Sequence, residues 1–337
     1  MKRHKQLFEE VASFRNLLNA ARVAYRGKRD RHAVAIFYFN LEHEVILLRE
    51  ELLAGTYQPR PYTLFEVREP KVRKICSSHF RDRVVHHAIC DVLEPILDRR
   101  LIFDTYACRT GKGSHRAIDR CQAFARKYDY FLKCDIRKYF DSIDHVILKR
   151  LLRRIVGDQR LSLLMETIVD HAVPGGVPGK GVPIGNLTSQ HFANLYLGEF
   201  DHYLKERLRL KGYLRYMDDF ICFSNDKAEL HQLLATIRVF VAKTLRLELK
   251  EEITRIAPVS EGVPFLGFRI FRKLRRLQRP NLIRLRQNVR RKETAYQNGH
   301  ISEADLFMSI QSMIAHISHA DTLALKRREF ERSLSLA

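Results

Sequence analysis

The sequence predicts an α+β fold in which helices pack on an antiparallel sheet and a helical region follows at the C-terminus. Three observations predict it. The 337 residues are 45% apolar, which is enough for a sizeable core and for two or three subdomains. Short apolar runs typical of strands lie between longer stretches of helical periodicity. Beyond Arg272 the composition shifts to arginine-rich stretches, which indicates a separate helical unit.

The first third of the chain is predicted to be mostly helical. Helices are expected over 41–53, ending at Gly55, and over 81–97, with a strand-like segment over 62–67 between them. Apolar residues at helical spacing near the start predict one amphipathic N-terminal helix, and these are Leu7, Val11, Phe14 and Leu18.

The middle of the chain is predicted to combine strands and helices. Its Gly- and Pro-rich part must be loop, because these residues interrupt both kinds of element. The expected elements are, in order, a buried strand over 131–136, a helix over 142–156, a loop over 173–185, a helix over 187–210, a hairpin over 213–223 and a strand over 265–270.

The charge of the chain indicates a polyanionic partner. Sixty Lys plus Arg against 39 Asp plus Glu give a formal net charge of +21, and nucleic acid is the commonest partner of such a surface. The alternative is a solvated basic surface. No apolar run is long enough to span a membrane, and six scattered cysteines offer neither a zinc pair nor a disulfide framework. We therefore expect a soluble cytoplasmic protein that binds nucleic acid and no membrane.

Three aspartates carry the chemistry that the sequence predicts. Asp135 ends one apolar strand, and Asp218 and Asp219 lie at the centre of the expected hairpin. An adjacent Asp pair alone is more often a solvated turn. Two strand-associated acidic positions in a strongly basic chain instead favour divalent cations, and nucleotidyl transfer needs two such ions close together. The sequence therefore predicts a magnesium site built on these carboxylates.

Four motifs in register resemble those of reverse transcriptases. Tyr216-Met217-Asp218-Asp219 is similar to their Y-x-D-D box, and the segment 133–140 (KCDIRKYF) resembles their first aspartate motif. The segment 106–114 (YACRTGKGS) resembles the fingers motif that contacts the template, and 263–268 (VPFLGF) resembles the primer-grip strand. Together they span roughly residues 60–270.

This resemblance implies a right-hand polymerase fold and RNA-directed DNA polymerase activity. Two Mg²⁺ ions, for which Mn²⁺ could substitute, would be held by Asp135, Asp218, Asp219 and the carbonyl of Ile136. The expected regions are an N-terminal helical extension over 1–55, fingers over 56–130, palm over 131–270 with part of the fingers inserted, and a helical thumb over 271–337.

The resemblance also implies binding residues. For the incoming nucleotide these are Lys71, Arg73, Lys74, Phe140, Ile184 and Gly185. For template and primer they are Arg109, Lys112, Ser189, Gln190, Tyr216, Met217, Leu266, Gly267, Arg284 and Arg291. An aromatic at 140 would block a ribose 2′-hydroxyl and so favour deoxynucleotides, or it simply packs between strand and helix. The basic side chains could instead be solvated, and the basic C-terminal surface could dock a protein or a structured RNA. Lys250 is a candidate general acid whose register is off by a few residues.

One segment narrows the resemblance. Most reverse transcriptases carry Q-G-x-x-x-S-P in the loop and helix beneath the nucleotide, whereas 184–190 here is IGNLTSQ, a form similar to the enzymes of diversity-generating retroelements. The short chain and the late segment 316–322 (HISHADT) fit that group. Such enzymes, of bacteria or phages, copy a template-repeat RNA into cDNA with errors at adenines, helped by a basic pentameric accessory protein. Ile184 cannot hydrogen-bond the nucleotide, so we expect weak discrimination, unless it is only a core residue.

Other functions stay open beside this one. A bacterial defence or retron-like reverse transcriptase would use the same chemistry. A non-catalytic RNA-binding scaffold on a polymerase fold would not need the aspartates, and an RNA-making polymerase would have no use for Phe140. His86, His87 and His171 lack carboxylate or Cys partners at metal-binding spacing and are interpreted as ordinary histidines. We expect no RNase H or endonuclease domain.

Overall fold

The computed structural model describes residues 4–28, 31–67, 73–171 and 173–327. Its secondary structure is the expected mixture of helices and antiparallel sheets. Three sheets of two, four and three strands are present in the described residues, and every strand pair is antiparallel. Within these residues no helix is both long and apolar enough to cross a membrane.

The N-terminal part is helical, with one correction to the expected elements. The single expected helix is two, α1 (Phe8–Val11) and α2 (Phe14–Tyr25). They separate at Ser13, whose hydroxyl accepts the Asn16 N–H at 3.2 Å and so caps α2. The Asn16 side chain also donates to the Ala88 carbonyl at 3.0 Å, which ties α2 to α5 (Phe80–Asp98).

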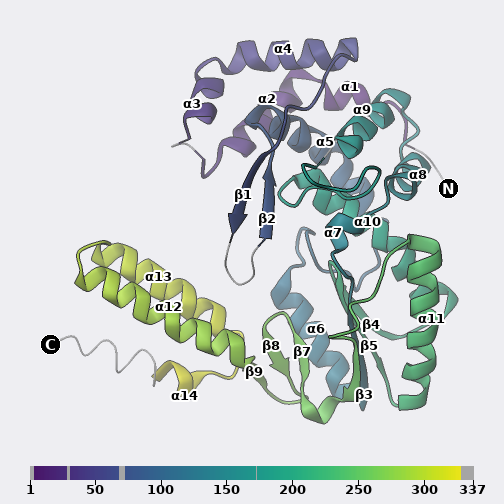
Figure 1. The fold of residues 1–337 in the computed structure, drawn as a ribbon, viewed down its shortest axis with the longest axis vertical. Coiled ribbons are helices and arrows are strands. Elements are labelled where there is room, and N and C mark those ends of the chain that lie inside the picture. Colours follow the sequence, from purple (N-terminus) through teal and green to yellow (C-terminus); the bar gives the residue numbers. More distant parts are fainter. Residues whose placement is uncertain (1–3, 29–30, 68–72, 172, 328–337) are drawn as a thin grey trace.

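Of the remaining elements of this part, the helix near 41–53 and the strand near 62–67 were expected, whereas the helix over 32–39 and the strand over 73–77 were not. Helix α3 (His32–Phe39) leads into α4 (Leu41–Ala54), which ends at Gly55 with a φ of 72°. A positive φ suits glycine at the end of a helix, so the expected stop is confirmed. Strands β1 (Thr63–Val67) and β2 (Arg73–Ser77) form a hairpin that extends from this helical layer toward the rest of the molecule (Figure 1).

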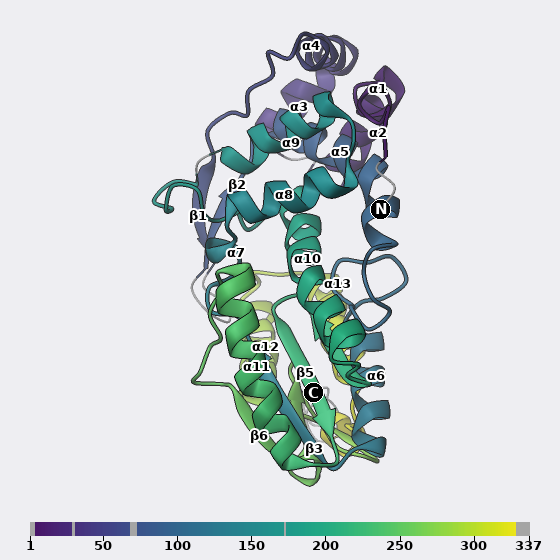
Figure 2. The ribbon, with the colours of Figure 1, turned by 90° about the vertical axis from the view of Figure 1, so that its right-hand side faces the viewer.

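A four-stranded sheet forms the centre of the molecule, in the order β4 (Gly212–Tyr216), β5 (Asp219–Ser224), β3 (Tyr130–Asp135) and β6 (Arg255–Pro258). Side chains of alternate strand residues point to opposite faces. Phe131 packs with α6 (Ser114–Lys127) on one face, whereas Leu132 joins the larger core on the other, with α10 (Leu187–His202) and α11 (Lys227–Leu245). Figure 2 shows α11 covering the sheet on this second side.

Two expected helices prove shorter than predicted. The helix over 142–156 is a short α7 (Tyr139–Ser142) followed by α8 (His145–Ile155), because Asp144 caps α8 by accepting the Ile147 N–H at 3.1 Å. The helix over 187–210 is α10, which continues as one π-helical turn over Tyr203–Arg207. Helix α9 (Gln159–Asp170) precedes the expected loop.

The expected strand over 265–270 is wrong, because the chain turns back in its middle. Strands β7 (Val263–Phe265) and β8 (Phe268–Ile270) pair around a two-residue turn, and β9 (Arg275–Leu277) completes a three-stranded sheet. Leu266 and Gly267 have φ of 46° and 87°, as the tight turn of a β-hairpin requires.

The arginine-rich C-terminal region is helical, as expected. Helix α12 (Arg279–Gln297) packs against α13 (Glu303–Ile317) through a small core, and α14 (Leu323–Lys326) follows. The helical pair leaves the three-stranded sheet and projects away from the central sheet, below the β1–β2 hairpin in Figure 1.

Candidate active site

The expected carboxylates gather at one end of the central sheet. Asp135 is the last residue of β3 and Asp219 the first of β5, and the two are paired residues in the antiparallel ladder. Tyr216 pairs with Asp219 across the neighbouring hairpin, so Met217 and Asp218 form a two-residue turn between them. The structure thus brings the three aspartates to one edge, from segments about eighty residues apart in the sequence.

A buried arginine donates a hydrogen bond to the main chain of the turn that carries Asp218. Met217 has a φ of 57°, a conformation that costs a residue with a side chain about 1–3 kcal/mol. The Arg215 Nη1 donates to the Met217 carbonyl at 2.8 Å, while its Nη2 meets Asp201 Oδ2 at 2.6 Å. Both side chains of this pair are fully buried, and Tyr213 Oη donates to the same carboxylate at 2.6 Å.

Arg215 keeps its charge in the core. Burial alone would lower the pKa of Arg215, but Asp201 raises it above its ordinary value. Neither residue was among the expected site residues. The signal that could have found them is a charged arginine in an otherwise apolar strand, since such a group requires a buried partner.

Lys133 contacts one of the expected metal ligands directly. It lies two residues before Asp135 in β3, so the two side chains leave the same face of the strand. Its Nζ forms an ion pair with Asp219 Oδ1, and the two side chains are 11% and 21% exposed. Burial raises the pKa of Asp219, Lys133 opposes this rise, and nearby Asp135 adds to it. Lys133 was also absent from the expected site residues.

The donor set fits magnesium once Lys133 releases Asp219. Among the described residues, no three His, Cys, Asp or Glu side chains already form a metal-binding group. The available donors are nevertheless the carboxylate and carbonyl oxygens that Mg²⁺ prefers. The Lys250 N–H donates to the Asp135 carbonyl and the Arg137 N–H to the Glu248 carbonyl, both at 2.8 Å. These bonds flank Ile136, so its own carbonyl points away from the 248–250 segment and toward β5.

The same contacts place Lys250 beside the site. Its main chain is bonded to Asp135, and its side chain is half-buried. Its candidacy as a general acid therefore remains a prediction.

Phe140 and Ile184, two expected nucleotide contacts, lie on neighbouring segments. The Phe140 carbonyl accepts the Val182 N–H at 2.9 Å, which brings the loop after α9 against α7. Phe140 is half-buried and its ring meets that of Tyr139 at 5.7 Å, so part of it belongs to the core. Both the packing role and the role as a steric gate remain compatible with this position.

The loop that carries Ile184 is bonded to β2. The Cys76 N–H donates to the Ile184 carbonyl at 3.3 Å, and the buried Asn186 side chain accepts the Ser78 hydroxyl. Gly185 has a φ of 126°, and a Cβ there would lie 3.0 Å from the Cys76 carbonyl oxygen. Only glycine satisfies both conditions, so the loop and the β1–β2 hairpin are joined at this point.

The expected phosphate contacts belong to this hairpin. Lys71 lies outside the described residues, as do the side chains of Arg73 and Lys74. The backbones of Arg73 and Lys74 pair with Val67 and Glu66. Their binding roles stay predictions.

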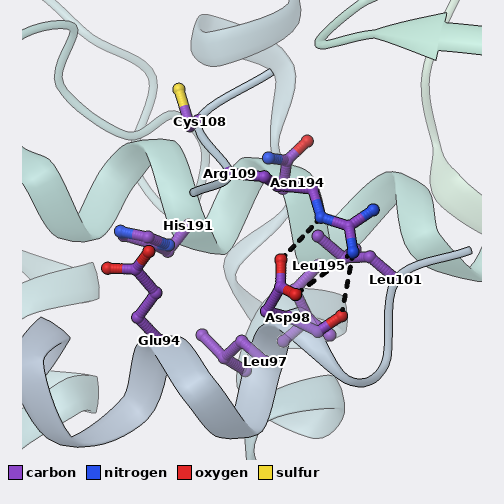
Figure 3. Close-up of a pocket in the computed structure, with 9 residues that line it drawn as sticks. All are labelled: Glu94, Leu97, Asp98, Leu101, Cys108, Arg109, His191, Asn194 and Leu195. Atoms are coloured by element: carbon purple, nitrogen blue, oxygen red, sulfur yellow. Dashed lines mark hydrogen bonds and ion pairs between the residues drawn. The ribbon is translucent and has the colours of Figure 1, made fainter. Parts of the chain in front are cut away.

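Two of the expected template contacts face into the protein. The Arg109 guanidinium donates to Asp98 at 2.6 Å (Figure 3). It also donates to the Ile102 and Thr105 carbonyls at 2.7 and 2.9 Å. Ser189 is only 3% exposed in α10. In this structure both residues contact the protein itself, and their role in template binding stays a prediction.

The other expected template contacts are more accessible. Lys112 is half-buried, with its Nζ 3.5 Å from the centre of the Phe103 ring. Gln190 is also half-buried and accepts the Cys108 thiol at 3.4 Å. Tyr216 is half-buried, whereas Met217 is almost wholly buried. The side chains of Lys112, Gln190 and Tyr216 are therefore partly accessible to solvent, and these residues remain candidate template contacts.

The expected primer-grip turn is bonded to the beginning of α12. The Gly267 carbonyl accepts the Gln278 N–H at 3.0 Å, just before the helix. Arg284 and Arg291 are seven residues apart on α12 and so lie on one face of it. The half-buried Leu266 occupies the same turn as Gly267.

The histidines behave as ordinary packing residues. His86 is buried and its Nδ1 contacts the Thr188 hydroxyl at 2.9 Å, and burial lowers its pKa to about 3. The His171 Nε2 contacts the Arg60 carbonyl at 3.1 Å. Neither ring contributes to a metal-binding group among the described residues.

Comparison with known proteins points to one family. Residues 67–270, more than half of the chain, match the family described as "Reverse transcriptase (RNA-dependent DNA polymerase)". Protein YkfC of Escherichia coli is 29% identical over 274 residues, which cover 68% of this chain and 72% of YkfC. The group II intron-encoded protein LtrA of Lactococcus lactis is 22% identical over 357 aligned positions, covering 86% of this chain and 58% of LtrA.

A solved structure supports the same fold. An apo telomerase from Candida tropicalis, truncated of its C-terminal domain, superimposes with a TM-score of 0.52 at 13% identity. The match covers 68% of this chain and 59% of the telomerase chain. The chain thus spans little more than half the length of LtrA and of this telomerase.

Proposed function

The chain belongs to the reverse transcriptase family of RNA-directed DNA polymerases, and we propose that it copies a template-repeat RNA into adenine-mutagenised cDNA within a diversity-generating retroelement. The observation that carries the polymerase part is the pairing of Asp135 with Asp219 beside the turn of Asp218. It provides the acidic edge that nucleotidyl transfer requires.

In this proposal, two Mg²⁺ ions, for which Mn²⁺ could substitute, would be held by Asp135, Asp218, Asp219 and the Ile136 carbonyl. The ions would supply activation of the primer 3′-hydroxyl and neutralisation of the leaving pyrophosphate. The chain supplies the positions of the ligands. Arg215 fixes the turn from within the core, and the ion pair with Lys133 orients the Asp219 carboxylate.

The regions keep their expected boundaries in the proposal. Fingers over 56–130 and palm over 131–270 would enclose the nucleotide, and a thumb over 271–337 would follow the duplex. The bond between Ile184 and Cys76 supports a nucleotide pocket formed jointly by the palm loop and the fingers hairpin. In this proposal Phe140, whose carbonyl is bonded to that loop, would meet the sugar and so favour deoxynucleotides.

The retroelement assignment depends on the segment 184–190. Ile184 replaces a residue that would hydrogen-bond the nucleotide, and an apolar side chain penalises a misplaced base less. A bacterial defence or retron-like enzyme is the second candidate, and the similarity to LtrA and YkfC is compatible with either.

The proposed partners are template RNA, the cDNA product, deoxynucleoside triphosphates and a basic pentameric accessory protein. The chain itself carries a net charge of +21, so it would repel another basic protein. We propose that RNA bridges the two, because a polyanion neutralises both surfaces.

The error rate tests this assignment. Sequenced cDNA made by the wild-type protein should show errors concentrated opposite template adenine. Ile184→Gln should lower the adenine error rate, whereas the apolar control Ile184→Leu should keep it. Equal error rates at all four template bases in the wild type would contradict the retroelement assignment without affecting the polymerase assignment.

A further inference from the structure

The turn between β7 and β8 is attached to α12 by a side chain that no motif singles out. Asn281 Nδ2 donates to the Gly267 carbonyl at 2.9 Å, and the Gln278 main chain donates to the same oxygen at 3.0 Å. A Cβ at Gly267 would collide with Asn281 Nδ2. The absence of a side chain at Gly267 is therefore what allows Asn281 to approach.

The other end of the same amide contacts a basic side chain. Asn281 Oδ1 accepts the Arg284 Nη1 at 3.3 Å. The Gly267 carbonyl needs the donor Nδ2 of the Asn281 amide, and the Arg284 guanidinium needs its acceptor Oδ1. Together these two contacts fix the orientation of the Asn281 side chain. Asn281 thus bridges the turn and Arg284, the second arginine of α12.

Arg284 belongs to a polar stripe on α12 that begins at Asn281. Asn281, Arg284, Asn288 and Arg291 follow one another at spacings of three and four residues, so they share one face of the helix. Beside this stripe, Leu285 and Val289 pack with Ile317 of α13. The face therefore has a fixed orientation relative to the core of the helical pair, and it starts at the turn.

We propose that Asn281 is a positioning residue that aligns this stripe with the β7–β8 turn, so that both contact the phosphate backbone of one template–primer duplex. The proposal rests on the function proposed above. Guanidinium groups bind phosphate oxygens by charge-assisted hydrogen bonds, and each such contact makes binding more dependent on salt. Without the Asn281 bridge, Arg284 would sample several rotamers and its phosphate contact would weaken.

Salt-dependent binding of an RNA–DNA template–primer tests the proposal. The slope of log Kd against log salt concentration should fall by about 1 in Arg284→Ala. Asn281→Ala should give a similar fall, and the double variant should fall no further. Asn298→Ala, which changes an exposed Asn at the other end of α12, should keep the wild-type slope.

Folding and chemistry serve as further readouts. Asn281→Ala should keep the wild-type melting temperature and the wild-type rate of a single nucleotide addition at saturating duplex, while fewer nucleotides are added per binding event. A wild-type slope in Asn281→Ala, or an unchanged slope in Arg284→Ala, would overturn the proposal. A wild-type protein that extends no primer would instead contradict the proposed function.

Discussion

Lys133 and Asp219 form an ion pair across β3 and β5, at the edge where Asp135 also lies. The Lys133 ammonium group is bound to a carboxylate oxygen that a metal ion would need as a ligand. Because an ammonium group and a divalent cation compete for the same oxygen, this contact is expected to regulate how readily the site takes up metal.

Removing the lysine should therefore strengthen metal binding. We expect Lys133→Met to bind Mn²⁺ about fivefold more tightly in the absence of nucleic acid, which corresponds to about 1 kcal/mol for a partly exposed ion pair. Calorimetric titration with Mn²⁺ measures this change in affinity. Lys149→Met, which breaks the exposed pair with Asp170, is the control and should leave the affinity unchanged. Weaker Mn²⁺ binding in Lys133→Met would show that the lysine assists the site.

The buried pair of Arg215 and Asp201 should dominate the stability of the site. Arg215→Met leaves Asp201 as an uncompensated buried charge, so we expect a loss of about 3–5 kcal/mol in the free energy of unfolding. Arg238→Ala breaks an exposed pair with Glu251 and should cost about 1 kcal/mol or less. Urea unfolding followed by circular dichroism compares the two. Equal losses would contradict the role given to Arg215.

Alanine substitutions at Gly185 and Gly179 distinguish the effect of backbone strain from the effect of losing the contact with β2. Gly185 and Gly179 both have positive φ, but only at Gly185 would a Cβ meet the β2 backbone, at 3.0 Å from the Cys76 oxygen. Both alanine variants should lose about 1 kcal/mol of stability from backbone strain. Gly185→Ala should in addition raise the KM for deoxynucleotides about tenfold, because the loop of Ile184 shifts. Equal KM values in steady-state primer extension would show that the loop does not form the nucleotide pocket.

Much of the site was predictable because its signals are local. The apolar run that ends on Asp135 predicts one strand, and the apolar residues on both sides of Asp218 and Asp219 predict the two strands of a hairpin. The structure confirms these strands as β3, β4 and β5. The strand expected over 265–270 was wrong because its apolar pattern continues through Leu266, whose left-handed conformation no periodicity indicates.

Contacts between distant residues could not be predicted in the same way. Arg215 meets Asp201, fourteen residues away, and Lys133 meets Asp219, eighty-six residues away. The inward orientation of Arg109 likewise depends on Asp98 and on main-chain carbonyls that the motif does not contain. A charged residue in the sequence shows that it needs a partner, but only the fold determines which one it finds.

Primer extension on an RNA template is the most direct test of the central claim, that Asp135, Asp218 and Asp219 form a metal-dependent polymerase site. The wild-type protein should extend a DNA primer with deoxynucleotides and Mg²⁺, and stop when the metal is chelated. Asp218→Asn should lower the rate by at least about a hundredfold, the equivalent of about 2.7 kcal/mol, while Asp91→Asn, at an exposed position of α5, keeps it. Equal extension by Asp218→Asn and the wild type would contradict the account.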